Sequence, residues 1–136
     1  MAVYSGTALV KKLGIKEGFR LAIFNAPKGF ANELGTLPAG TKSLPRPANL
    51  DFALFFARSE SELFRNFSRL ALMLNPHGML WVAWPKKAAG VATDLSESVV
   101  RRIGLNGGLV DVKICAVNDV WSGLKFVYRL KDRPSE

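Results

Sequence analysis

The chain has 136 residues, of which 49% are hydrophobic and 22% are charged, and this balance excludes a wholly disordered protein. Its 19 basic and 11 acidic residues give a net charge of +8, which favours anionic partners such as phosphates, nucleic acid or membrane surfaces. The single cysteine, Cys115, excludes an internal disulfide, and the single histidine, His77, leaves zinc without its usual ligands, so we expect no metal site.

The length and the N-terminal sequence indicate a single soluble domain. The first residues lack the basic-then-apolar pattern of a signal peptide, and no apolar run is long enough to span a bilayer. We therefore expect a cytoplasmic protein with no membrane partner, folded as one domain over residues 1–136.

The first third of the chain predicts short elements separated by breakers. Residues 7–13 predict a short helix that ends near Gly14, and the apolar run FRLAIF (19–24) has the length of a strand. The breaker-rich NAPKGF follows, and then a short helix at 31–34. Residues 35–50 contain three prolines and two glycines, which predict a loop with a short edge strand at 41–44.

Two apolar runs in the middle of the chain predict buried strands on either side of a helix. The runs are DFALFFA (51–57) and MLWVAW (79–84), and neither alternates with polar residues, as is typical of strands buried on both faces. Between them, residues 59–74 follow a helical period. The apolar stripe of this helix consists of Leu63, Phe67, Leu70 and Leu74. Ser59 and Glu62 predict a capping box at its start, and NPHG (75–78) predicts a turn at its end.

The last third predicts a helix and a hairpin. Asp94 with Glu97 repeats the capping signal before a helix at 95–104. After NGG (106–108), apolar residues recur at every second position, as is typical of a strand. The predicted apolar faces of the two strands are Val110, Val112 and Ile114 in the first, and Leu124, Phe126, Tyr128 and Leu130 in the second. Joined by NDVWSG, these strands predict an antiparallel pair with one solvated face.

The order of the elements predicts the fold class. Strands that alternate with helices favour an α/β protein with a mostly parallel sheet, and helices on both faces make a three-layer, Rossmann-like sandwich. The predicted hairpin adds a C-terminal antiparallel pair at one edge of a shortened sheet.

This order, with its closing hairpin, resembles the class I methyltransferase fold. LGIKEGFRLAIFNAPKG (13–29) is similar to the segment that leads into the first strand of those enzymes. LALMLNPHGMLWVAW (70–84) resembles their helix, leucine-x-proline-glycine-glycine turn and apolar strand. The chain resembles more closely a family of short uncharacterised bacterial proteins, a domain of unknown function, in which WPKK (84–87) and WSGLK (121–125) are recognisable.

The cofactor loop departs from the methyltransferase pattern. The family reads acidic-x-glycine-x-glycine-x-glycine, and the matching positions here are Ile23, Asn25, Pro27 and Gly29, of which only the last is kept. Proline also removes a backbone amide. No acidic residue lies between Glu33 and Asp51 to take the place of the carboxylate that holds the ribose hydroxyls. We therefore expect a degenerate cofactor loop and no cofactor.

Basic residues nevertheless follow three predicted strands. In open parallel sheets, ligands bind beyond the carboxyl ends of the strands. The candidate ligand-binding residues at these ends are Asn25, Lys28, Gly29, Arg58, Trp84, Lys86 and Lys87. Helix N-termini near Ser59 and Asp94 add positive potential. The pattern predicts an anion pocket, while the alternative is that the lysines only solvate loops and that Trp84 closes the core instead of stacking on a base.

The sequence predicts no catalytic residues. It contains no serine–histidine–aspartate set, no paired acid and base carboxylates and no phosphate-cradling glycine loop, and His77 precedes a strand and so lies at the opposite edge. We expect a non-catalytic binding or regulatory module for a small anionic ligand. Three alternatives stay open: a divergent S-adenosylmethionine-dependent methyltransferase, a nucleic-acid-binding protein, for which the basic residues are scattered along the chain, and a structural protein that forms a homodimer through its edge strand or hairpin.

Overall fold

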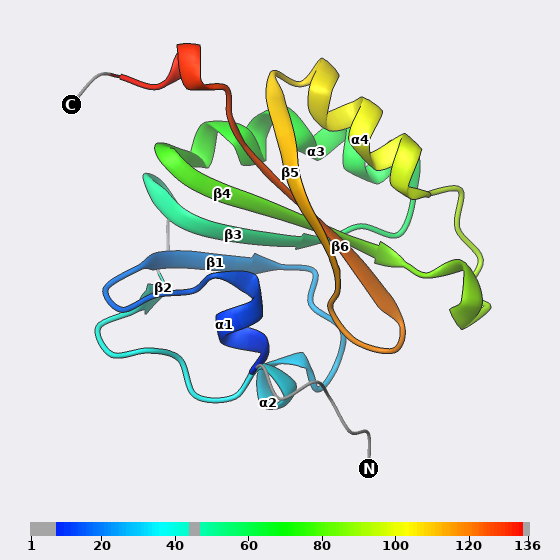
Figure 1. Cartoon of the computed structure of the whole chain (residues 1–136). Helices are drawn as coiled ribbons and strands as arrows, with labels where there is room; N and C mark the ends of the chain where they lie inside the picture. Colours follow the sequence, from blue (N-terminus) through cyan, green and yellow to red (C-terminus); the bar gives the residue numbers. More distant parts are fainter. Residues whose placement is uncertain (1–7, 44–46, 135–136) are drawn as a thin grey trace.

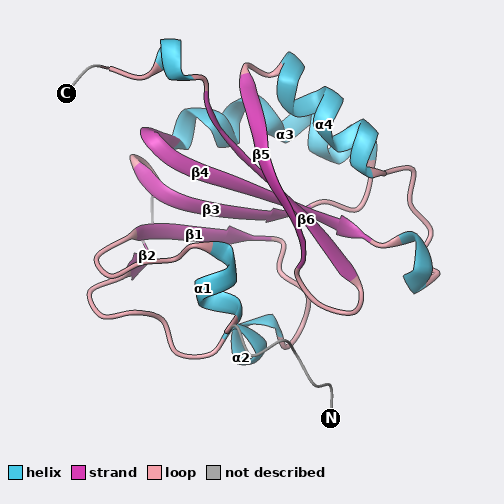
Figure 2. Cartoon of the chain, in the orientation of Figure 1, coloured by secondary structure: helices cyan, strands magenta, loops and turns pink. Residues whose placement is uncertain are grey.

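The computed structural model describes residues 8–43 and 47–134, and these form one six-stranded sheet with helices on both faces (Figures 1 and 2). The strands are β1 (Arg20–Phe24), β2 (Lys42–Ser43), β3 (Leu50–Phe56), β4 (Leu74–Pro85), β5 (Leu109–Ala116) and β6 (Trp121–Tyr128). The helices are α1 (Leu9–Leu13), α2 (Phe30–Leu34), α3 (Glu60–Met73) and α4 (Glu97–Asn106), with 3₁₀ turns at Lys87–Ala89 and Leu130–Asp132. Residue 7 of the predicted first helix and residue 44 of the predicted edge strand lie outside the described residues.

The strand order confirms the predicted fold class. The order across the sheet is β2-β1-β3-β4-β6-β5. Strands β1 to β4 are parallel, and β6 runs antiparallel to both β4 and β5. The C-terminal hairpin therefore lies at one edge of the sheet, with its second strand inserted next to the parallel part (Figure 2).

Two apolar clusters, one on each face of the sheet, form the core. Helices α3 and α4 cover one face, where Phe67 packs edge-on against Phe126 with the ring centroids 5.5 Å apart. Helices α1 and α2 cover the other face, where Phe56 packs edge-on against both Phe30 and Trp121. Burial of this apolar surface is the main force that holds the three layers together. Within the described residues, every helix is too short or too polar to cross a membrane.

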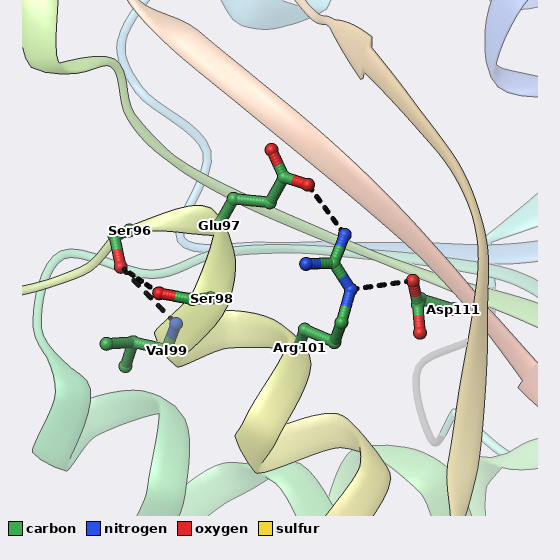
Figure 3. A network of polar contacts seen from close by, with 6 residues as sticks. All are labelled: Ser96, Glu97, Ser98, Val99, Arg101 and Asp111. Atoms are coloured by element: carbon green, nitrogen blue, oxygen red, sulfur yellow. Dashed lines mark hydrogen bonds and ion pairs between the residues drawn. The ribbon is translucent and has the colours of Figure 1, made fainter.

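The helix caps differ in part from the predicted ones. Ser59 caps α3 as predicted, because its hydroxyl accepts a hydrogen bond from the Glu62 amide at 3.2 Å. The prediction that Asp94 caps α4 is wrong: Ser96 is the cap, and its hydroxyl accepts from the Val99 amide at 3.3 Å (Figure 3). The Asp94 carboxylate instead accepts from the amide of Glu60, at 2.8 Å, and so adds a second cap to α3.

An arginine joins α4 to the edge strand. The Arg101 guanidinium donates to Glu97 at 2.6 Å and to Asp111 of β5 at 2.8 Å, and these hydrogen bonds to Asp111 and Glu97 raise its pKa (Figure 3). Asp111 thus faces the layer formed by α3 and α4.

The predicted apolar face of β5 is also wrong. A register shift between Asp111 and Lys113 inserts an extra residue and breaks the alternation. Val112, the extra residue, is 55% exposed, and Ile114, on the same face as its buried partner Leu124, is 47% exposed. On β6 the predicted face holds, with Leu124 and Phe126 buried, although Leu130 lies beyond the strand and is exposed. The predicted turn at 75–78 is part of β4, at an irregularity where the pairing shifts between Leu50 and Phe52.

Candidate functional site

The candidate site lies where three parallel strands end. Strand β1 ends at Phe24, β3 at Phe56 and β4 at Pro85, and the register pairs Phe24 with Phe55 and Phe56 with Ala83. The three loops that follow these strands therefore start at the same edge of the sheet. In parallel α/β sheets this carboxyl edge is where ligands bind.

A polar cluster links the first two of these loops. The Arg58 guanidinium donates a hydrogen bond to the Asn25 carbonyl oxygen at 3.2 Å. The Asn25 amide group in turn donates to the Glu62 carboxylate at 3.5 Å, and the Arg58 backbone amide donates to the same carboxylate at 2.8 Å. The structure thus brings two predicted site residues together around Glu62, which the sequence indicated only as a helix cap. Its place in the first turn after a buried strand was the signal that could have identified it.

The loop after β1 turns through two residues with a left-handed backbone. Asn25 has φ 58° and Gly29 has φ 87°. Asparagine is one of the few side chains that adopt this region readily, and glycine adopts it without cost. A Cβ at Gly29 would have no atom within 4 Å, so the position requires glycine for its conformation and not for space. The turn brings the chain directly into α2.

An apolar cavity of about 500 Å³ lies beside β1. Strand β1, helix α2 and the loops beside them form its walls. The lining residues are Leu21–Phe24, Ala26, Phe30, Ala31, Leu34, Gly35, Leu37, Ser43 and Pro47. Strand β2 pairs only with Arg20 and Leu21, so no described strand covers the edge of β1 from residue 22 onward. Ser43 is the one hydroxyl among the described lining residues. The sequence did not predict this cavity, because it depends on how short the β2 pairing is.

A second cavity, of about 410 Å³, lies at the end of β4. Trp84, Lys86 and Lys87 line it, together with Glu97 at the start of α4 and Ile114 of β5. Trp84 is only 5% exposed, so it belongs to the core and also forms part of the cavity wall.

The predicted residues thus fall into separate places along the edge. Asn25 and Arg58 meet through a hydrogen bond, and the two lysines after β4 share the second cavity. Lys28 is exposed and lines neither cavity. A ligand role for these residues stays a prediction.

Arg58 also covers a buried tryptophan. Its Cζ atom lies 5.2 Å from the centre of the Trp121 ring. The Arg58 carbonyl oxygen accepts a hydrogen bond from the Thr93 hydroxyl at 2.8 Å, which fixes the β3–α3 loop against the segment before α4. Trp121 is only 7% exposed, so it closes the core. Among the described residues, no group of three acidic, histidine or cysteine side chains could hold a metal ion.

Solved structures with the same fold are S-adenosylmethionine-dependent methyltransferases. One from Aquifex aeolicus is 18% identical, with a TM-score of 0.62 over 87% of this chain and 86% of that one. Magnesium protoporphyrin IX methyltransferase from Synechocystis, with bound S-adenosylmethionine, is 11% identical, with a TM-score of 0.57 over 89% and 74%. A TehB-like enzyme from Corynebacterium glutamicum is 7% identical, with a TM-score of 0.58 over 89% and 85%. No protein-family model and no curated protein matches the chain.

These structures confirm the resemblance of fold and correct the expected function. The expectation of a non-catalytic module for a small anionic ligand is contradicted, because these structural neighbours are methyltransferases. The Synechocystis enzyme was solved with S-adenosylmethionine and with S-adenosylhomocysteine bound. They favour the alternative of a divergent methyltransferase.

Proposed function

We propose that the chain is a divergent S-adenosylmethionine-dependent methyltransferase that binds its cofactor at the carboxyl edge of β1. The observation that carries this proposal is the cavity of about 500 Å³ beside β1, whose wall continues past the carboxyl end of the strand to Ala26 and α2. Ligands bind beyond the carboxyl ends of the strands in parallel α/β sheets. Small-molecule sites commonly have volumes of about 300–1,000 Å³ and mostly apolar walls. When bound, S-adenosylmethionine supplies an electrophilic methyl group on a sulfonium.

The described residues fit the separate parts of this cofactor. Phe24, Phe30 and Leu34 offer an apolar wall for the adenine ring, and the Ser43 hydroxyl offers a hydrogen-bonding group for the ribose. These residues come from the strand, the helix and the edge of the sheet that meet at the cavity.

Glu62 does not line the cavity, but it lies at the neighbouring loop and is our candidate to replace the acidic residue that this loop lacks. Glu62 reaches the β1–α2 loop from α3 and lies 3.5 Å from the Asn25 amide nitrogen. Its negative charge suits the ammonium group of the methionine part. The Arg58 guanidinium uses one donor on the Asn25 carbonyl and has others for a carboxylate, since an arginine carries five N–H donors.

The second cavity is our candidate for the methyl acceptor. Lys86 and Lys87 line it, and the acidic residue at its wall, Glu97, is paired with Arg101. The two lysines therefore favour an acceptor that carries a negative charge. Membership of the family of short bacterial proteins and a cytoplasmic location stay predictions.

Cofactor binding is tested by isothermal calorimetry with S-adenosylmethionine and S-adenosylhomocysteine. We expect micromolar affinity for the parent protein. Ala31→Trp fills the cavity and is expected to weaken binding by more than about tenfold, which corresponds to 1.4 kcal/mol. Ala92→Trp is the matched control, because Ala92 is exposed and lines neither cavity. Equal affinity of the two variants, or no binding by the parent at millimolar cofactor, would contradict the proposal.

The role of Glu62 is tested by Glu62→Gln, which keeps the shape of the side chain and removes its charge. We expect about tenfold weaker binding of both cofactor forms, because both carry the ammonium group. Transfer itself is followed with methyl-labelled S-adenosylmethionine and a cell extract. Label in a product is expected with the parent and with Ala92→Trp, and not with Ala31→Trp.

A further inference from the structure

Two lysines face each other across the hairpin, on the side of the sheet that carries α1. Lys113 of β5 and Lys125 of β6 are direct cross-strand partners. Lys125 is also the register partner of Trp81 of β4, whose side chain is buried in the core cluster under α1 and α2. Cross-strand partners point to the same face, so both lysines lie on that side. Like charges directly opposite each other destabilise a pair of strands.

Two further lysines lie near this place, Lys12 on α1 and Lys16 in the segment that follows the helix. The Trp81 indole nitrogen donates a hydrogen bond to the Leu13 carbonyl oxygen at 2.8 Å, which places the end of α1 against the centre of the sheet. Lys12 and Lys16 lie on either side of Leu13 in the chain. The pKa of Lys125 is lowered, first by burial and then by the positive charges of Lys113 and Lys16. This agrees with the three lysines lying close together. We call Lys12, Lys16, Lys113 and Lys125 the lysine face.

The lysine face has no counter-charge of its own. Within residues 8–43 and 47–134, none of its four side chains forms an ion pair or a hydrogen bond. On the other side of the sheet, by contrast, the Arg102 guanidinium pairs with Glu60 at 2.7 Å. Four unpaired cations on one face cost electrostatic free energy in the free protein, and an anionic partner of matching extent would recover it.

We infer that the lysine face binds the phosphate backbone of a nucleic acid. A strand of regularly spaced phosphates presents several negative charges at once, which matches a face that carries four cations. The surface lies on the hairpin and α1, apart from both cavities, so binding to it does not depend on the proposed cofactor site.

The test measures the anisotropy of a fluorescently labelled oligonucleotide over a series of salt concentrations, with no cofactor present. The parent is expected to bind, with affinity that falls steeply as salt rises. The double variant Lys113→Gln, Lys125→Gln is expected to bind more than about tenfold more weakly at low salt, and its salt slope should fall by about two, one for each lysine.

The matched control is Lys42→Gln, Lys131→Gln, which removes the same charge from two exposed lysines on β2 and on the last 3₁₀ turn. This control should keep the slope of the parent. Equal losses in the two double variants would overturn the inference, and so would a parent that binds vesicles of an anionic phospholipid but no oligonucleotide.

Folding and cofactor binding are followed in the same proteins. Lys113→Gln, Lys125→Gln should melt at the same temperature as the parent or higher, because it separates no favourable pair, and its affinity for S-adenosylmethionine should be unchanged. If that variant fails to fold, Lys12→Gln, Lys16→Gln replaces it with the same expected loss of slope. If the parent binds the oligonucleotide but not the cofactor, only the proposed methyltransferase function is contradicted. The failure of that proposal can therefore be told apart from the failure of the lysine-face inference.

Discussion

The Arg58 guanidinium lies over the ring of Trp121, with its Cζ atom 5.2 Å from the ring centre, and also donates to the carbonyl of Asn25. Asn25 follows β1, Arg58 follows β3, and Trp121 begins β6. One exposed side chain therefore joins the ends of three strands at the edge where the proposed cofactor binds.

Removing this side chain is expected to loosen the edge of the sheet. Arg58→Ala should lower the free energy of unfolding by about 1 kcal/mol, since an exposed cation–π contact contributes about 0.5–1 kcal/mol and the hydrogen bond to Asn25 is lost as well. Urea denaturation measures the change. Arg65→Ala is the control, because Arg65 is exposed on α3 and has no partner among the described residues. An equal effect of the two substitutions would show that Arg58 contributes nothing specific.

The two caps before α4 are expected to act on different helices. Ser96→Ala should cost about 1 kcal/mol, as the loss of a helix N-cap typically does, and should speed hydrogen exchange at the Val99 amide. Asp94→Ala should instead speed exchange at the Glu60 amide, at the start of α3. NMR hydrogen exchange separates the two outcomes. Faster exchange at Val99 in the Asp94 variant would restore the capping role that the sequence predicted.

Gly104 of α4 is expected to tolerate no larger residue. A Cβ added there would lie 2.0 Å from the Phe126 ring, in the core between α4 and the sheet. Glycine to alanine inside a helix ordinarily gains up to about 1 kcal/mol, but overpacking a core costs about 1–3 kcal/mol. We therefore expect Gly104→Ala to lower the free energy of unfolding.

Thermal and urea denaturation measure this change. Ser68→Ala, at an exposed position of α3, is the control and should change the free energy by less than about 0.5 kcal/mol. A stabilised Gly104→Ala protein would mean that α4 does not pack on Phe126 as described.

The thiol of Cys115 is expected to report on the lysine face. Burial raises its pKa, while the positive charges of Lys12 and Lys113 act in the opposite direction by favouring the thiolate. The rate of alkylation by iodoacetamide should therefore rise with pH around a midpoint above the usual value of about 8.5.

Removing a nearby cation should move this midpoint further up. Lys113→Gln takes away a charge that stabilises the thiolate, so the alkylation midpoint should rise above that of the parent. Lys42→Gln, far along the chain on β2, should leave it unchanged. A midpoint that falls in Lys113→Gln would contradict the placement of Lys113 beside the thiol.

Local sequence patterns were sufficient for the elements whose signals agree with each other. The helical stripe at Leu63, Phe67 and Leu70 is buried as predicted, and Ser59 caps that helix. The continuous apolar run of β3 is buried along nearly its whole length. In these segments the cap, the period and the burial all point to one structure, which is why the layers and the fold class followed from the sequence.

The rest depended on information that no local pattern contains. Asp94 and Ser96 are both cap residues at the right distance from a helix, and only the packing of α4 beside α3 decides between them. The register shift after Asp111 puts Val110 and Ile114 on opposite faces of β5, without any glycine or proline to mark it. The lysine face requires the hairpin register and the contact of α1 with Trp81, so its residues looked scattered along the chain.

The position of β6 has a consequence for how the protein is made. Strand β6 lies between β4 and β5, and it is the only described neighbour of β5 in the sheet. When a nascent chain has emerged from the ribosome only as far as Ala116, the strand that pairs with both β4 and β5 is still missing. The backbone groups of β4 and β5 that face β6 therefore have no partner in the sheet at that stage. The order of the strands in the sheet therefore differs from their order of synthesis, because β5 is made before the strand with which it pairs. The strand that leaves the exit tunnel after β5 is the one that joins the hairpin edge to the parallel half.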